Sequence, residues 1–518
     1  MPPPLRQPWP TFAKSQAGRR NVCTVRLLSG WRRPRLPALC PHRPSAGARA
    51  SRTRMGRTIR RRRHRGTDYP LLSGGLTMVM TTAPGTLAAH ALSRFGFGAG
   101  PGDLDRVKSD PRGWVESQLT PRPLPAIVAD HQGSAPRVAD MAAARKAKGE
   151  VEEMAKKRGR EQYRADIAIR TRLAAGSDAP LQERLVQFWS NHFTVSTQRP
   201  VIAPLGLAYE NEAIRPHILG NFRDMARAAI LHPAMLIYLD NAQSIGPDSK
   251  AGQKRDKGLN ENLGREALEL HLLGVDGGYH QDDVRAMALV LTGWTLDEER
   301  GTATFAPRRH QPGEKVLLGQ RIPESGIAEA AAAIDMLCAH PATANHVAQR
   351  LARHFIADNP PPAAVTALAK AFRDSRGDLA HVTATLVKMD AAWAQPLAKM
   401  RSPNDFITAT LRASAAEIPD DRIVNAMNLL GQMPFAAPSP AGWPDKAADW
   451  TGPDAILRRI DWSLAFGQRV GAKLDARSFI DTALGDLADD GLRQAVARAP
   501  SPAEALGLVL SSPAFQRR

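Results

Sequence analysis

Residues 181–193 read LQERLVQFWSNHF, and this stretch sets the expected fold class. Its apolar side chains recur every three or four positions, which places them on one face of an α-helix. The residues of this face are Leu181, Leu185, Phe188, Trp189 and Phe193. A half-buried strand would instead alternate strictly between apolar and polar residues. The stretch therefore predicts a strongly amphipathic helix.

Helical patterns continue on both sides of this stretch. Residues 139–175 interleave acidic and basic side chains, which is typical of a long solvent-facing helix or a helical hairpin. Further helices are predicted at residues 327–338, 343–357, 362–374, 378–389, 403–416, 421–431, 453–471 and 502–511. Between residues 302 and 319 the runs TATF and KVLL flank a turn, which predicts a small β-hairpin. We therefore expect an all-α fold, a large multi-helix globular body over residues 84–518 with one small β-hairpin-like insertion.

The composition agrees with a globular body and excludes several classes of protein. The chain has 518 residues, enough to bury a large core without covalent staples. Of its three cysteines only Cys338 lies in the body, so neither a disulfide framework nor a cysteine-rich zinc motif is expected there. No run of 18 apolar residues occurs, and we therefore expect no transmembrane segment.

The positive charge of the chain is concentrated at its N-terminus. Residues 1–80 contain 18 Lys and Arg side chains against one acidic residue, Asp68, and so carry +17 of the formal net charge of +19. A body with nearly balanced charge lacks the clustered Lys and Arg that bind phosphates, so no nucleic acid partner is expected for it. The leader mixes Arg and Pro without a sustained period, which predicts disorder.

Three explanations of the leader compete: a targeting peptide, a basic arm, or upstream codons included through a wrong start codon. A secretory signal is disfavoured because its apolar stretch, residues 22–30, is interrupted by Arg26. We favour the wrong start codon, since Met78 and Met80 stand just before the first clean helical pattern. A cytoplasmic location is then expected, and export stays an alternative because of the leader's arginine pairs and runs.

The densest polar segment is GLNENLGREALELHLLGVDGGY, residues 258–279. On a helix, Asn262, Glu266 and Glu269 would line one face. Carboxylates spaced by three residues can share a metal ion or a proton, as in helical-bundle carboxylate sites. The commoner outcome is an exposed polar stripe or ion pairs with neighbours such as Arg265. Both interpretations stay open at this point.

Two histidines complete the candidate polar site. His192 projects from the apolar face of the first helix, which favours a buried histidine with hydrogen-bond partners over a ligand or general base. His310 lies in the one irregular segment, RRHQPGEK, and functional groups are often placed on such loops. With Glu266 and Glu269 these histidines are the candidate ligands of a divalent metal.

Several long segments resemble a known family. They are FWSNHFTVS, AIRPHILGNFRDMARAAILHPAMLIYLDNAQSIGP, GLNENLGREALELHLLGVDGGYHQDDVRAMALVLTGW, HPATANHVAQRLARHF and SPAGWPD. Together they resemble the bacterial family catalogued as domain of unknown function 1800, from about Leu87 to the end of the chain. The resemblance implies an uncharacterised protein without an established activity, in a family where many members resemble exported proteins. The chain is more similar to the shorter members, which lack an evident signal peptide.

The chain departs from the family pattern at one position. The family usually has an acidic residue after the histidine of its HxxGxK loop, whereas Gln311 follows His310 here. If that acid orients the histidine or binds a cation in the family, the carboxylate for this role is absent from position 311 here.

Two functions from different classes fit these observations. The first is a non-catalytic binding or assembly protein, in which histidine, glutamate and asparagine side chains form a buried polar network. The alternative is a metal-dependent, hydrolase-like enzyme with a cation held by some of Glu266, Glu269, His192 and His310, where metal-bound water would be the nucleophile. We rank the first higher because no GxSxG, HExxH or P-loop motif occurs.

Overall fold

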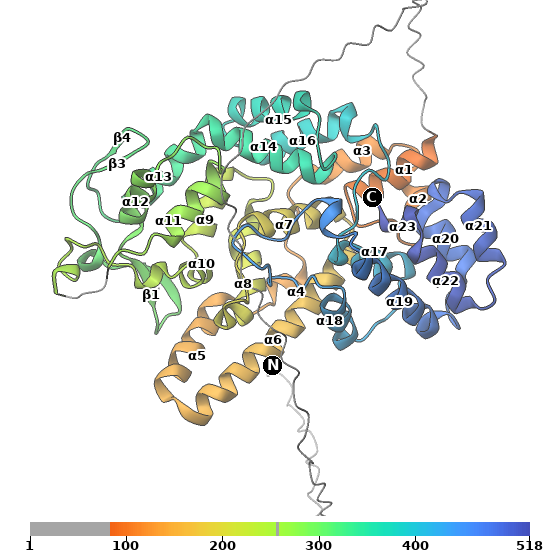
Figure 1. Ribbon diagram of the computed structural model, residues 1–518, viewed down its shortest axis with the longest axis horizontal. Helices are drawn as coiled ribbons and strands as arrows, with labels where there is room; N and C mark the ends of the chain where they lie inside the picture. Colours follow the sequence, from red (N-terminus) through yellow and green to blue (C-terminus); the bar gives the residue numbers. More distant parts are fainter. Residues whose placement is uncertain (1–82, 255–257) are drawn as a thin grey trace, which may run out of the picture. The chain divides into compact units, whose positions relative to one another are not determined.

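The computed structural model of the chain describes residues 83–254 and 258–518. The predicted leader, residues 1–80, and its alternative start codons lie outside the described residues. The described residues are mostly helical and contain two small antiparallel sheets (Figure 1). The predicted all-α fold is confirmed. In this part of the chain no helix is both long and apolar enough to cross a membrane.

The first half of the described chain is a succession of helices. They are α1 (Pro84–Arg94), α2 (Asp103–Val107), α3 (Pro111–Glu116), α4 (Ala126–Ala129), α5 (Ser134–Ala147), α6 (Gly149–Gly176), α7 (Pro180–His192), α8 (Gly206–Tyr209), α9 (Phe222–Ile230), α10 (Pro233–Tyr238), α11 (Asn262–Glu266) and α12 (Gln281–Leu291). Of the two forms predicted for the charged segment, a long helix or a helical hairpin, the structure has the hairpin, because backbone with positive φ at Lys148 and Gly149 separates α5 from α6. Two π-helical segments, Glu210–Ile214 and Ala267–Leu272, follow α8 and α11.

The second half begins with four short strands and continues as helices. The elements are β1 (Trp294–Asp297), β2 (Thr302–Phe305), β3 (Lys315–Leu317), β4 (Gln320–Ile322), α13 (Ala328–Ala339), α14 (Pro341–Phe355), α15 (Pro362–Asp374), α16 (Leu379–Lys388), α17 (Pro403–Ser414), α18 (Asp420–Leu429), α19 (Pro453–Val470), α20 (Ala476–Leu484), α21 (Asp490–Ala497), α22 (Pro502–Ser511) and α23 (Pro513–Gln516). The eight helices predicted after residue 320 all occur, with ends within two residues of those expected.

Two of the four strands, β2 and β3, lie in the region predicted for the hairpin, whereas β1 and β4 lie outside it, and the pairing differs from the prediction. The runs TATF and KVLL do not pair with each other: β2 pairs with β1, and β3 pairs with β4. Leu318 and Gly319 connect β3 to β4, and both have positive φ angles, of 50° and 73°. Two such residues form the tight turn that suits the twist of a two-residue hairpin. Because that turn follows KVL directly, this run pairs forward along the chain.

Many helices begin with proline in the first turn, where the missing N–H costs no hydrogen bond. His232 and His340 stand just before such prolines and act as N-caps. Their Nδ1 atoms accept hydrogen bonds from the main-chain N–H groups of Ala234 (3.1 Å) and Ala342 (3.2 Å). Both histidines therefore have a structural role at helix starts.

The buried apolar residues form two clusters. The first takes its members from residues 88–393 and includes the predicted apolar face of α7. The second consists of side chains from α17 to α23 and the segments between them, together with Ile167 of α6. Helices α7 and α17 belong to different clusters and are joined by an ion pair between Arg184 and Asp405. Polar side chains of these two helices line a pocket between them.

Candidate functional site

Asn262, Glu266 and Glu269 lie on one continuous stretch, which starts as α11 and continues as the π-helix Ala267–Leu272. Asn262 is exposed, and the two glutamates are half-buried. Burial and the neighbouring charge of Glu269 raise the pKa of Glu266 above its usual value. Arg265 pairs with Glu261, at 3.3 Å, and not with either glutamate. The two carboxylates thus share a local electrostatic environment.

His192 lies in the first core with only 2% of its surface exposed. Its Nε2 atom bonds to the main-chain oxygen of His271 at 2.8 Å, and its ring centroid is 5.6 Å from that of His346. Burial, and then the charges of Arg350 and the two neighbouring histidines, hold its pKa well below the usual value. The ring is therefore neutral at physiological pH.

His310 belongs to a buried charged network. Its Nε2 atom lies 3.0 Å from Oε1 of Glu329, and its Nδ1 atom lies 2.8 Å from the main-chain oxygen of Thr292. Lys315 Nζ contacts the other Glu329 oxygen at 2.7 Å. The acid beside His310 therefore comes from the start of α13 and not from the next position, where Gln311 bonds instead to Asp248.

These observations place the predicted residues in separate environments. His192 and His310 bond to partners other than Glu266 and Glu269. Over residues 83–254 and 258–518 no group of three or more His, Cys, Asp and Glu side chains is placed so that it could hold a metal ion. The divalent metal stays a prediction without a supporting contact.

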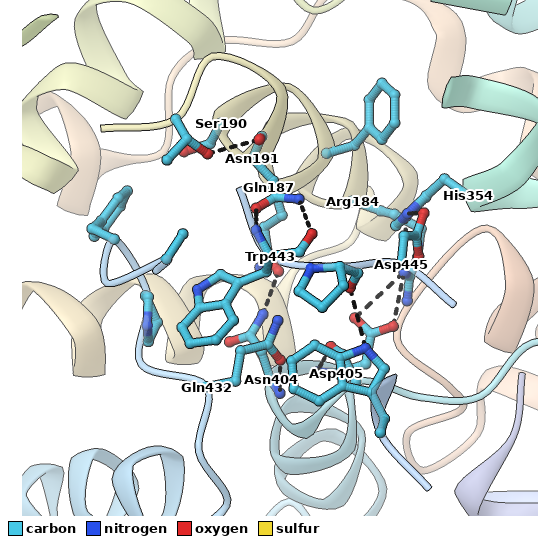
Figure 2. Close-up of a pocket in the computed structure, with 18 of the residues that line it drawn as sticks. Arg184, Gln187, Ser190, Asn191, His354, Asn404, Asp405, Gln432, Trp443 and Asp445 are labelled. Atoms are coloured by element: carbon cyan, nitrogen blue, oxygen red, sulfur yellow. Dashed lines mark hydrogen bonds and ion pairs between the residues drawn. The ribbon is translucent and has the colours of Figure 1, made fainter. Parts of the chain in front are cut away.

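A different set of polar side chains lines a pocket of about 100 Å³ between α7 and α17 (Figure 2). The polar and charged lining residues are Arg170, Arg184, Gln187, Ser190, Asn191, Thr194, Arg350, His354, Ser402, Asn404, Asp405, Gln432, Asp445 and Arg518. Aromatic side chains contribute as well, from Phe188, Phe435, Trp443 and Trp450. Residues 432–450, after α18, supply one wall of the pocket.

This wall is fixed by hydrogen bonds from other elements. The side-chain amide of Asn191 forms two hydrogen bonds with the main chain of Trp443. Its Nδ2 donates to the Trp443 carbonyl oxygen (2.9 Å), and its Oδ1 accepts from the Trp443 N–H (2.7 Å). Ser196 Oγ donates to the oxygen of Ala437 at 2.6 Å, and Tyr163 donates to that of Pro434 at 2.7 Å. The pocket is therefore preformed, since its irregular wall is anchored along its length.

Two aspartates in the pocket are held as anions. Asp405 lies 3.1 Å from Arg184 and 3.0 Å from Arg518. Burial opposes the charged form, but these two arginines outweigh it and lower the pKa of Asp405 to about 2. Asp445 Oδ2 lies 3.0 Å from His354 Nδ1. Its pKa is also lowered, because His354 and Lys399 outweigh the effect of burial.

His354 is a neutral hydrogen-bond bridge. Burial lowers its pKa to about 4, despite the neighbouring charge of Asp445. With Nδ1–H donating to Asp445, its Nε2 lone pair faces a guanidinium nitrogen of Arg184 and one of Arg518, both at 3.5 Å. Ser190 lines the same pocket, but no hydrogen bond joins it to His354 in the described chain. A serine–histidine–aspartate relay is therefore not assembled.

Arg350 differs from the other arginines of the pocket. Arg170 pairs with Glu210 at 2.9 Å, and Arg184 and Arg518 pair with Asp405. Arg350 makes no hydrogen bond and no ion pair with any residue that the structure describes. Asp445 acts on it only through the longer-range attraction between their charges. The pocket therefore presents one cationic group that is not used by the protein.

Sequence reasoning missed this pocket, although a signal for it was present. Three of the five segments that carry the family resemblance supply its lining: FWSNHFTVS contains Asn191, HPATANHVAQRLARHF contains Arg350 and His354, and SPAGWPD contains Trp443 and Asp445. Asn191 and Trp443 are 252 residues apart in the sequence, so only the fold shows that these segments meet.

Comparison with known proteins gives a family but no activity. No curated protein and no solved structure matches the chain. The family model described as "Protein of unknown function (DUF1800)" matches residues 90–517, which includes every residue of the pocket except Arg518. The match extends over most of the chain, and the chain therefore belongs to this family.

Proposed function

We propose that the chain is a non-catalytic binding protein, and that its pocket takes the anionic group of a small ligand. The observation that carries this proposal is Arg350, which lines the pocket without a hydrogen bond or ion pair to any described residue. A guanidinium with free donors suits bidentate binding of a carboxylate or phosphate group.

The charge of the pocket supports an anion. With Arg170 neutralised by Glu210, the lining carries Arg184, Arg350 and Arg518 against only Asp405 and Asp445. His354 adds no charge, since its pKa is about 4. Arg350 is half-buried and has no ion pair with a described residue, and a bound anion would compensate its partly desolvated charge.

The histidine of the pocket argues against catalysis. A general base needs a lone pair within reach of the proton it removes. The available lone pair of His354, on Nε2, faces two guanidinium groups that also disfavour protonation. The metal-dependent hydrolase would need Glu266, Glu269, His192 and His310 to share a cation, and no contact among the described residues favours it.

The proposal is tested with Arg350→Gln, which keeps hydrogen-bonding capacity and removes the charge. Propionate is the probe, titrated calorimetrically at constant ionic strength. We expect binding to the unchanged chain and an affinity at least about tenfold lower in the variant, because a charge-assisted bidentate contact is lost. The matched control is Arg122→Gln, an exposed arginine that lines a different pocket. Equal propionate affinity in Arg350→Gln and the unchanged chain would contradict the proposal.

A further inference from the structure

A pair of side-chain amides faces the same pocket as Arg350. Gln187 comes from α7 and Asn404 from the start of α17, and both line the pocket. Asn404 Nδ2 donates to Gln187 Oε1 at 2.7 Å. Asn404 Oδ1 is buried and has no hydrogen-bond partner in the described chain, and the residue is only 9% exposed. Buried amide oxygens are normally paired, so this atom points to a missing donor.

The pair presents one donor and one acceptor. As placed, Gln187 Nε2 is a donor without a partner in the described chain, and Asn404 Oδ1 is the matching acceptor. Reversing both amides exchanges these roles and still leaves one donor and one acceptor. Asn404 is also held in place, since its main-chain N–H donates to Gln432 Oε1 at 2.9 Å. The complement of such a pair is a group that both accepts and donates.

We infer that the ligand is a short-chain hydroxycarboxylate, whose carboxylate binds Arg350 and whose hydroxyl binds the Gln187–Asn404 pair. The carboxylate half rests on the proposed function, and the hydroxyl is the addition. A hydroxyl donates and accepts through one atom. An ammonium group only donates, and the excess of arginine in the pocket repels it, so an amino acid fits less well.

The size of the pocket limits the ligand. Its volume of about 100 Å³ is smaller than the roughly 150 Å³ cavity known to hold benzene. A pocket of this volume suits a molecule of about six non-hydrogen atoms or fewer, which corresponds to a two- or three-carbon hydroxy acid.

Three probes with the same three-carbon carboxylate skeleton separate the chemical features: lactate, propionate and alanine. Each is titrated into the full chain at constant ionic strength, with lactate measured as both enantiomers. We expect one lactate enantiomer to bind about fivefold more tightly than propionate, because one hydrogen-bonding group is added. Alanine should bind more weakly than propionate. Equal affinities for lactate and propionate that still depend on Arg350 would overturn the hydroxyl inference and leave the proposed function intact. Absence of binding by all three probes would overturn both.

Two variants locate the hydroxyl. Asn404→Leu and Gln187→Met should each abolish the preference for lactate over propionate while propionate affinity changes little. Arg350→Gln should instead weaken lactate and propionate alike. Gln494→Met, at an exposed position on α21, is the matched control and should keep the preference. If Asn404→Leu fails to fold, Gln187→Met carries the test, and an undiminished preference in it would overturn the inference.

Discussion

At the scale of single residues, the interior of this chain holds ions through partners that are distant in sequence. Glu329 is fully buried and accepts hydrogen bonds from Lys315, from His310 and from the main-chain N–H of Ser325. Burial alone would raise its pKa, but these donors outweigh it, so the pKa of Glu329 lies below its usual value. The carboxylate of Glu329 is therefore an anion, and it serves as the hydrogen-bond partner of two buried side chains, Lys315 and His310.

Glu329→Gln removes this anion with little change of shape. We expect the free energy of unfolding to fall by about 3–5 kcal/mol, because Lys315 would stay buried without its counter-charge. Denaturant unfolding at pH 7.5 measures the change. Glu314→Gln is the control: Glu314 directly precedes Lys315 in the sequence, is exposed, and pairs with Arg321 at 3.3 Å. Its effect should stay below about 0.5 kcal/mol. Equal effects in the two variants would show that the network is solvated.

The sequence predicted some residue environments and missed others for a physical reason. The burial of His192 follows from its place on the apolar face of α7, since helical spacing alone determines that face. The partner of His310 could not be predicted in the same way, because Glu329 is brought to it by the packing of α13. His354 and Asp445 are 91 residues apart, and nothing in local spacing relates them. The metal site, built on Glu266, Glu269, His192 and His310, stays a prediction.

At the scale of elements, sequence periodicity predicted the positions of the helices well but did not predict which strands pair. A helix satisfies its main-chain hydrogen bonds within one segment, so its pattern is complete in the local sequence. A strand needs a partner, and here the partner depends on turns such as Leu318–Gly319, whose residues are not the Asn-Gly or Asp-Gly pairs typical of tight hairpins. The irregular wall of the pocket, residues 432–450, has even less local signal.

The side-chain amide of Asn191, on α7, supplies two of the hydrogen bonds that hold this wall. Asn191→Ala removes both hydrogen bonds to Trp443, so we expect faster amide hydrogen exchange around residues 441–445 and weaker propionate binding. Mass spectrometry of exchanged peptides measures the first effect. Asn345→Ala, at an exposed position on α14, is the control and should leave both measurements unchanged. Unaltered exchange in Asn191→Ala would mean that Ser196 and Tyr163 suffice to hold the wall.

At the scale of the whole described chain, buried arginines connect the two cores. Arg94 of α1 donates to main-chain oxygens of Phe355, Ile356 and Arg518, and Arg401 donates to that of Arg517. Most of these guanidinium N–H groups donate to main-chain carbonyl oxygens and not to carboxylates. Burial and the neighbouring arginines accordingly lower the pKa of Arg94 to about 9.

The same low-dielectric interior holds several histidines in the neutral form. Burial lowers the pKa values of His90, His346 and His354 to about 4 and that of His271 to about 3. His271 is the extreme case: it is fully buried, it stacks on Phe193 with ring centroids 5.3 Å apart, and neither ring nitrogen has a partner within the described chain. These histidines take up protons readily only when the chain unfolds.

Stability should therefore fall as the pH falls from about 6.5 towards 4. The unfolded chain binds protons near pH 6.5, whereas the folded chain resists them until the pH approaches 4, so each lowered histidine removes up to about 1.4 kcal/mol per pH unit in that window. Above pH 7.5 both states are neutral at these residues and the effect vanishes. Buried carboxylates such as Asp405 add to the loss only below about pH 4, because their own pKa values are depressed. Urea unfolding at several pH values measures the slope.

The substitution His271→Phe removes one of the histidines that bind a proton when the chain unfolds. The phenyl ring can keep the stacking on Phe193 and has no nitrogen to desolvate, so at pH 7.5 we expect the free energy of unfolding to be unchanged or raised, by at most about 3 kcal/mol. Between pH 6.5 and 4.5 the variant should lose stability less steeply than the unchanged chain, by up to about 1.4 kcal/mol per pH unit. His381→Phe, at an exposed position on α16, should keep the original slope. If His271→Phe also kept the original slope of unfolding free energy against pH, the His271 ring of the unchanged chain would already be protonated or paired in the folded state. The acid sensitivity would then have to come from carboxylates instead.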